Sequence, residues 1–281
     1  MTRVLVLGAA GMLGSMLCEV LGRDGDLDVI ASRREGAVAF DARDDDPGEL
    51  LDRTGAAWAI NAIGVLKSRI DESSSASIAQ ALEVNALFPH RLAEAAARRG
   101  VRVIAVGTDG VFSGRDGPYA EDAPRDAPDV YGQSKALGEA PGEHVVSLRC
   151  SIVGTAPGSL GGWLLDRPHA ARVPGFADQR WNGLGTVQLA RVCAGIVRGG
   201  CTCHGAVHVV PADVVTKAQL LRTIAAAFGR DDLEVVDTTS DAPADRSLAT
   251  LDPARNEMLW HAAGYDRPPT IAAMVAELAA L

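Results

Sequence analysis

The chain lacks the features that mark membrane and nucleic-acid-binding proteins. No run of residues reaches the ~20 apolar positions that a membrane helix needs, and the apolar stretch at its start is too short for a signal peptide. It also has no cluster of lysine and arginine, and its net charge is −9. These absences argue against membrane and nucleic-acid partners and predict a cytoplasmic protein.

Cysteine is sparse and odd in number. Five cysteines in a chain of 281 residues predict reduced thiols rather than a disulfide framework. Cys201, Cys203, His204 and His208 lie close together in the sequence. Zinc sites usually space their cysteines by two to four residues, so this Cys-x-Cys pattern fits poorly and we expect no metal site.

What the first half does contain is a regular alternation of short apolar runs and amphipathic stretches. Strands are expected at 3–7, 27–32, 37–40, 57–61, 101–106 and 145–148, and helices at 11–21, 47–53, 77–99 and 131–140. Runs that are apolar throughout suit parallel strands covered on both faces. The alternation therefore predicts an α/β fold with a doubly wound, Rossmann-type parallel sheet.

The amino-acid composition changes after residue 154, because the stretch 155–185 is rich in glycine and proline. A helix at 186–198 and a strand at 206–210 are expected to return to the sheet. Helices at 216–228 and 270–281 and a strand at 233–237 are expected in the tail. We therefore predict a dinucleotide-binding domain at 1–154 plus 186–210, and a smaller C-terminal substrate lobe at 155–185 plus 211–281.

A glycine-rich loop follows the first expected strand. Gly8 permits a tight turn, Gly11 lets the backbone approach a pyrophosphate, and Gly14 allows a helix to pack closely on the strand. With Met12 and Leu13 they form a GxxGxxG spacing, in which the pyrophosphate meets free N–H groups at the helix start. The alternative is that small residues here serve only the packing of helix on strand.

The second strand ends in Ser32, Arg33 and Arg34. A carboxylate at this point would bind the ribose hydroxyls of NADH, whereas a basic pair suits the extra phosphate of NADPH. We favour NADPH, with NADH as an alternative and with solvated surface charges as the simpler interpretation. Asp41 and the stretch Asn61-Ala62-Ile63-Gly64 are expected to flank the adenosine, although Asn61 is also a common turn residue.

Tyr131 and Lys135 are four residues apart, so on a helix their side chains share one face. A nearby ammonium lowers the pKa of a phenol from about 10, which makes the tyrosine a proton donor near neutral pH if the lysine outweighs burial. Thr108 follows another expected strand, and its hydroxyl can donate to a substrate carbonyl oxygen. The alternatives are a solvent-facing Tyr/Lys pair and a Thr108 that only caps a turn.

These patterns resemble the extended short-chain dehydrogenases/reductases and, more narrowly, the dTDP-4-dehydrorhamnose reductase family of nucleotide-sugar 4-ketoreductases. The resemblance covers nearly the whole chain. It is carried by the glycine loop, Phe40-Asp41-Ala42, Val84-Asn85-Ala86, the run from Thr108 to Gly114, the run from Tyr131 to Glu139, Asp178-Gln179, and Ser247 with Leu251-Asp252.

The resemblance implies that Thr108, Tyr131 and Lys135 are the catalytic set, and that hydride from a nicotinamide reduces the 4-keto group of a nucleotide-linked deoxysugar. It adds Ala42 and Asn85 to the cofactor contacts. The substrate contacts that it implies are Asp109, Gly110, Val111, Asp178, Gln179, Arg180, Trp181 and Asn182.

The chain also departs from the family pattern. The family usually has Tyr where this chain has Gly110, and Trp near Ile152, and both aromatics lie near the sugar. These losses put dTDP-4-dehydrorhamnose itself in doubt as the substrate. Trp181 is expected to replace these aromatics beside the sugar, and Arg180 to bind the diphosphate. The alternative is that Trp181 is an ordinary core residue.

Three other functions stay open. A non-catalytic dinucleotide-binding subunit would keep the fold and lose the chemistry. Related dehydratases carry a second acid after the aspartate, where this chain has Gly110. An epimerase would need a further acid/base pair, for which His169 is a candidate without a convincing partner. The sequence does not fix the oligomeric state, and a homodimer is compatible with it.

Overall fold

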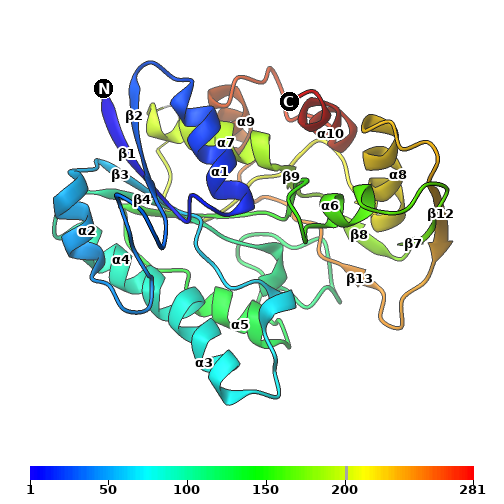
Figure 1. Ribbon diagram of the computed structural model, residues 1–281, viewed down its shortest axis with the longest axis horizontal. Coiled ribbons are helices and arrows are strands. Elements are labelled where there is room, and N and C mark those ends of the chain that lie inside the picture. The colour runs from blue at the N-terminus through cyan, green and yellow to red at the C-terminus, as the bar shows by residue number, and fades with distance from the viewer. Residues whose placement is uncertain (200–201) are drawn as a thin grey trace.

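A computed structural model describes residues 1–199 and 202–281, so Cys201 lies outside the described residues. Its centre is a six-stranded sheet in the order β10-β5-β4-β3-β1-β2 (Figure 1). Every pair of neighbours in this sheet is parallel. The strands are β1 (Thr2–Leu7), β2 (Leu27–Ser32), β3 (Trp58–Asn61), β4 (Arg102–Val106), β5 (Val145–Arg149) and β10 (Gly205–His208).

The expected Rossmann-type sheet is thereby confirmed, with one strand fewer. β2 and β3 pair with opposite sides of β1, so the strand order reverses there. Ligands of doubly wound sheets bind at the carboxyl ends of the strands at such a reversal. The strand expected at 37–40 is wrong: the segment makes only an isolated bridge between Arg33 and Ala39. Ala37 and Ala39 are exposed, so the segment has too little apolar surface to bury for a further strand.

Helices cover both faces of the sheet (Figure 1). Apolar side chains of α1, α7, α9 and α10 belong to one core cluster, and those of α2 and α4 to another, with sheet residues in both. The helices are α1 (Met12–Gly22), α2 (Pro47–Thr54), α3 (Ser75–Leu82), α4 (Phe88–Ala97), α5 (Val130–Leu137), α6 (Leu160–Leu165), α7 (Thr186–Val197), α8 (Lys217–Ala227), α9 (Pro253–Ala262) and α10 (Ile271–Ala279). Within the described residues, no helix is both long and apolar enough to cross a membrane.

The helix expected at 77–99 is interrupted by a π-helical turn, Glu83–Leu87, between α3 and α4. Pro89 has no N–H, so it cannot donate to the carbonyl of Asn85 four residues earlier. That carbonyl lies against α5, where a Cβ on Gly138 would be only 1.9 Å from it. The proline and the glycine thus bring the Asn85 segment and the helix of Tyr131 into direct contact.

Smaller sheets form at the far end of the molecule from α2, beside α8 (Figure 1). β8 (Gln179–Trp181) lies between β11 (Val215–Thr216) and β13 (Ala244–Asp245), β7 (Arg172–Phe176) pairs with β12 (Glu234–Thr238), and β6 (Ile152–Val153) pairs with β9 (Leu184–Gly185). Most of these strands come from the segments that we assign to the substrate lobe. The two-domain division of the chain stays a prediction. The stretch 155–185, which has few periodic signals, contains α6, β7, β8 and β9. Helix α9 was not expected.

Candidate active site

The glycine loop has the geometry of a dinucleotide cradle. Gly8 has a φ of +79°, which favours glycine, and Gly11 N donates to its carbonyl at 2.9 Å. A Cβ on Gly14 would lie 2.1 Å from Gly8 O, so α1 can approach β1 only with glycine here. Gly11 is the N-cap of α1 and has no side-chain cap. The first N–H groups of the helix are therefore available to a ligand phosphate.

The loop after β3 meets this cradle at the reversal of strand order. A Cβ on Gly8 would be 3.1 Å from the Ala62 carbonyl carbon and from Ile63 Cγ1. Asn61 Oδ1 accepts a hydrogen bond from Ile63 N at 3.0 Å, so Asn61 shapes the turn through its side chain. Met12 lies near Gly154, where an added Cβ would be 2.7 Å from its sulfur, and Leu13 is buried.

Arg33 and Arg34 follow the buried Ser32 and are exposed. Arg34 Nε lies 3.7 Å from Asp41 Oδ2, and Arg43 binds the same carboxylate at 3.2 Å. Hydrogen bonds from Arg43 hold the pKa of Asp41 below its usual value. Asp41 is therefore tied to basic residues of its own loop, beside the buried Ala42.

Asn85 clamps the segment after β3 to α5. Its side chain accepts from Val65 N at 2.8 Å, donates to Val65 O at 2.9 Å, and donates to Ser134 Oγ at 3.1 Å. Gly64 packs against the same amide, since a Cβ there would be 3.4 Å from Asn85 Oδ1. Asn85 thus positions the loop beside the catalytic helix, and its expected contact with the cofactor stays a prediction.

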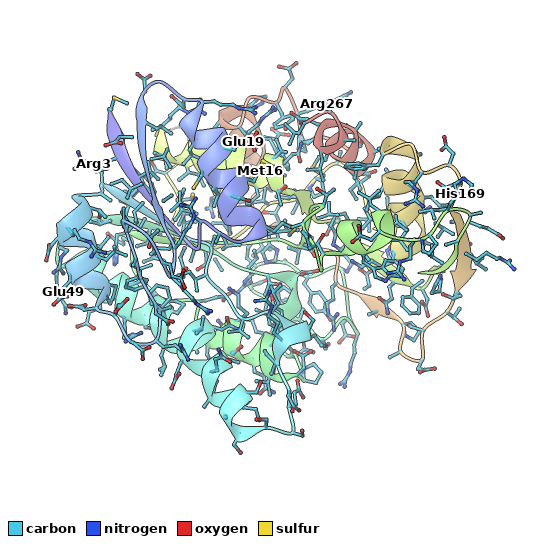
Figure 2. The ribbon with its side chains drawn as sticks, viewed as in Figure 1. Arg3, Met16, Glu19, Glu49, His169 and Arg267 are labelled. Atoms are coloured by element: carbon cyan, nitrogen blue, oxygen red, sulfur yellow. The ribbon has the colours of Figure 1, made fainter. Side chains whose placement is uncertain are left out.

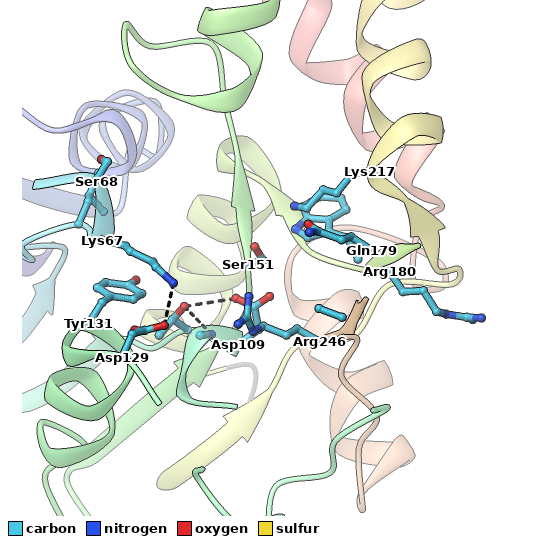
Figure 3. Close-up of a pocket in the computed structure, with 15 residues that line it drawn as sticks. Lys67, Ser68, Asp109, Asp129, Tyr131, Ser151, Gln179, Arg180, Lys217 and Arg246 are labelled. Carbon is cyan, nitrogen blue, oxygen red and sulfur yellow. Dashed lines mark hydrogen bonds and ion pairs between the residues drawn. The ribbon is translucent and has the colours of Figure 1, made fainter. Parts of the chain in front are cut away.

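A cavity of about 400 Å³ opens between the carboxyl ends of the central strands and the smaller sheets (Figure 3). Besides Arg180, six predicted site residues line it: Thr108, Asp109, Gly110, Tyr131, Gln179 and Trp181. Arg180 also lines the cavity but points toward its outer edge (Figure 3), where its Nε lies 3.2 Å from Asp245. The other lining residues are Leu66, Lys67, Ser68, Asp129, Ser151, Lys217, Ala244 and Arg246, which sequence reasoning missed.

Thr108 and Tyr131 are brought together by two glycines. Thr108 caps the 3₁₀ turn η3 (Asp109–Val111), where its Oγ1 accepts from Gly110 N at 3.0 Å. A Cβ on Gly110 would lie 2.9 Å from Tyr131 Cε1, and one on Gly132 would lie 2.3 Å from Gly110 O. Both glycines therefore let the first turn of α5 pack on η3. Thr108 caps this turn, as the alternative interpretation expected, and it also lines the cavity.

The prediction that Lys135 lowers the pKa of Tyr131 below its ordinary value is wrong for this structure. Burial raises the pKa of Tyr131, and the neighbouring Thr108 hydroxyl opposes that rise only in part. Lys135 Nζ instead donates to the Val106 carbonyl at 2.9 Å, at the carboxyl end of β4. Burial lowers the pKa of Lys135 itself to about 8.

Three charged groups, Asp109, Lys217 and Arg246, line the cavity. Burial raises the pKa of the Asp109 carboxyl, and the cations Lys217 and Arg246 oppose that rise. Arg246 donates to the carbonyls of Phe112 and Ser113 at 2.9 and 3.2 Å. Lys217 stands over the ring of Trp181, with Nζ 5.1 Å from its centroid. The cavity therefore presents fixed positive charge opposite Tyr131 (Figure 3).

Three predicted substrate residues are not among those that line the cavity. Asp178 accepts hydrogen bonds from the backbone and hydroxyl of Ser240. Asn182 is buried and binds both backbone groups of Leu248, at 2.7 and 2.8 Å. Val111 is fully buried in a core cluster with Phe112 and Tyr119. Each of these residues lies next in sequence to a residue that lines the cavity, so they support the cavity lining without contributing to it.

No histidine is among the residues that line the cavity in the described part of the chain. His169 is exposed at the rim of the molecule (Figure 2) and is not among the cavity residues. His208 is buried in β10, where it bonds to the carbonyl of Ala249. Within residues 1–199 and 202–281, no group of three or more His, Cys, Asp or Glu side chains is placed to hold a metal. Cys18, Cys150 and Cys193 are free thiols.

Fold and site together define a Rossmann-type protein of the short-chain dehydrogenase/reductase class. Comparison with known proteins narrows this class. The chain belongs to the family described as RmlD substrate binding domain, which matches residues 1–259.

Two curated relatives align along most of the chain. A dTDP-4-dehydrorhamnose reductase of Streptomyces griseus is 28% identical over 94% of this chain and 88% of its own. A dTDP-4-keto-6-deoxy-D-glucose reductase of Streptomyces niveus is 28% identical over 93% and 91%. Among solved structures, dTDP-4-dehydrorhamnose reductase of Bacillus anthracis in complex with NADP has a TM-score of 0.80 at 18% identity, covering 99% and 98%.

Proposed function

We propose that the protein is an NADPH-dependent reductase of the 4-keto group of a nucleotide-linked deoxysugar, acting in sugar or polysaccharide biosynthesis. The observation that carries the proposal is that Thr108 and Tyr131 line one cavity, while Lys135, four residues after Tyr131, donates to the carbonyl of Val106 at the carboxyl end of β4. Family membership and the named reductases among the relatives support it.

The residues fit a dinucleotide. A side chain at Gly8 or Gly14 would collide with backbone atoms, so the loop leaves room for a pyrophosphate at the start of α1. Arg33 would meet the 2′-phosphate of NADPH, and Arg34, whose Nε lies 3.7 Å from Asp41, would supply a second cation. NADH is the alternative cofactor. When bound, the nicotinamide supplies the hydride that reduces the carbonyl carbon.

The side chains of this protein would supply the proton that the carbonyl oxygen receives. The raised pKa of Tyr131 keeps its phenol protonated at neutral pH, so it can donate to the carbonyl oxygen. The Thr108 hydroxyl would hold that oxygen by a second hydrogen bond. Lys135 would bind the nicotinamide ribose with the donors that its hydrogen bond to Val106 O leaves free.

The sugar is expected to differ from that of typical family members. Gly110 and the stretch at Ser151-Ile152 lack the usual aromatics, and Trp181 occupies the wall instead. A Cβ on Gly183 would lie 2.4 Å from both Trp181 Cζ2 and Ser151 O, so the ring packs against that stretch. Gln179, Arg180 and Asp109 would complete the contacts. Tyr131 packs directly on Gly110, so the usual aromatic side chain would not fit at that position.

The test is a panel of dTDP- and UDP-linked 4-keto sugars incubated with the protein and NADPH. We expect NADPH absorbance to fall with at least one of them, and mass spectrometry to show a product two hydrogens heavier. Tight NADPH binding without oxidation by any member would contradict the reductase and favour a regulatory subunit.

A further inference from the structure

Lys217 occupies an unusual place for a lysine. It is the first residue of α8, between Thr216 and Gln219, the two residues that form the capping box of this helix. The N-terminal end of a helix carries partial positive charge, so a cation there is destabilising. Arg246 adds a second repulsion, and burial lowers the pKa of Lys217 to about 8. Helix stability therefore gives no reason for a lysine at this position.

The ammonium of Lys217 also lacks a hydrogen-bond or ion-pair partner among the described residues. Lys67 forms an ion pair with Asp129 at 2.7 Å, and Lys135 donates to Val106 O at 2.9 Å. For Lys217 the part of the chain that the structure describes provides no hydrogen bond and no ion pair within 4.0 Å. Its contacts are the face of Trp181 and the longer-range attraction of Asp109. A lysine has three N–H donors, and leaving them unpaired near the interior is costly.

The unpaired donors face the cavity that contains Tyr131 (Figure 3). Charge in the cavity does not balance: its lining residues include the cations Lys67, Arg180, Lys217 and Arg246 against the carboxylates of Asp109 and Asp129. Arg246 is fixed by two backbone carbonyls, so it contributes charge from a constant position. An anionic acceptor from the ligand would satisfy the donors of Lys217 and balance the excess charge together.

We propose that Lys217 binds an anionic oxygen of the sugar nucleotide and is a specificity-determining residue of this site. The inference rests on the proposed function, because that function supplies the ligand class. The anionic oxygen belongs either to the diphosphate or to a carboxylate on the sugar. Asp109, beside Lys217, would accept hydrogen bonds from sugar hydroxyl groups.

Isothermal titration calorimetry with UDP, dTDP, UDP-glucose and UDP-glucuronate tests the proposal without turnover. The variants are Lys217→Met, which keeps the stem over Trp181, and Lys217→Arg, which keeps the charge. Arg222→Met is the matched control, since Arg222 is an exposed cation of the same helix that pairs with Asp237. Thermal unfolding of each variant checks that the fold is retained.

Losing a charge-assisted hydrogen bond should weaken binding by about 10- to 100-fold. If the partner is the diphosphate, Lys217→Met loses affinity for all four nucleotides. If it is a carboxylate, the loss is confined to UDP-glucuronate. Unchanged affinity for all four would overturn the proposal. A wild-type protein that binds the nucleotides yet reduces no 4-keto sugar would contradict the proposed function alone.

A pH series separates a direct contact from a structural role. The groups that face Lys217 are Asp109 from η3, Arg246 after β13 and Tyr131 from α5. Lys217 is charged below its pKa of about 8 and neutral above it. Nucleotide affinity should therefore fall as the pH rises through 8, and Lys217→Arg should abolish that fall. The same fall in both proteins would assign it to another group and count against the contact.

Discussion

The ion pair between Glu139 and Arg149 joins the catalytic helix segment to the central sheet. Arg149 Nε and Nη2 donate to the two carboxylate oxygens of Glu139 at 2.6 and 2.7 Å. The two side chains are only 4% and 9% exposed. Glu139 also accepts from the more exposed Arg125 at 2.8 Å. Glu139→Gln would keep the shape of the side chain and remove its charge.

The expected cost follows from what Arg149 keeps. Its Nη1 still donates to Glu121 O at 3.0 Å and lies 3.2 Å from His208 Nε2. Neither partner carries the negative charge that Glu139 supplied, because one is a backbone carbonyl and the other is a histidine ring. Burial lowers the pKa of His208, which favours the neutral ring. Removing one partner of a buried ion pair typically costs about 3–5 kcal/mol. Glutamine can still accept one hydrogen bond, so we expect a loss of about 3 kcal/mol.

Urea denaturation, followed by circular dichroism, measures this loss. The matched control is Glu94→Gln, which breaks a surface pair with Arg98 whose side chains are 70% and 60% exposed. Surface pairs contribute little, so the control should match the wild type within error. Equal stability of Glu139→Gln and Glu94→Gln would refute the argument that burial makes this pair necessary.

Three further predictions concern the cofactor side and the phenol. In the cofactor-free protein, the tyrosinate absorbance lost in Tyr131→Phe should develop only above pH 10, because burial raises the pKa; development near neutrality would contradict this. Gly14→Ala places a Cβ 2.1 Å from Gly8 O and should weaken NADPH binding about tenfold, whereas Gly22→Ala, with nothing within 4 Å, should not. Arg33→Ala should weaken NADPH about 10- to 100-fold and NADH little; equal losses would end the phosphate argument.

The parts of the fold that are local in sequence could be predicted. Strands β1, β2 and β5 are apolar runs bounded by polar residues, and the glycine loop lies within one strand–turn–helix unit. The segment 37–40 was mistaken for a strand because its residues are apolar, although Ala37 and Ala39 are exposed and only Phe40 is buried. Helix α9 was missed because its apolar residues do not follow a single stripe.

The site was predictable only on one side. Thr108 and Tyr131 carry family motifs, so both were expected, whereas Ser151, Lys217 and Arg246 reach the cavity from separate segments far along the chain. The sequence around Lys217 contains one signal that could have indicated a site. Lysine occurs only three times in the chain, and Lys217 lies at the start of an amphipathic helix. The pKa of Tyr131 depends on burial, which no spacing of residues reveals.

The central claim is that Tyr131 gives its proton to the substrate carbonyl oxygen. Its most direct test is the rate of NADPH oxidation by Tyr131→Phe with the best 4-keto sugar of the panel, alongside the NADPH dissociation constant. We predict a loss of about 100- to 10,000-fold in rate with cofactor affinity nearly unchanged. A phenylalanine variant that reduces the sugar at the wild-type rate would contradict the account.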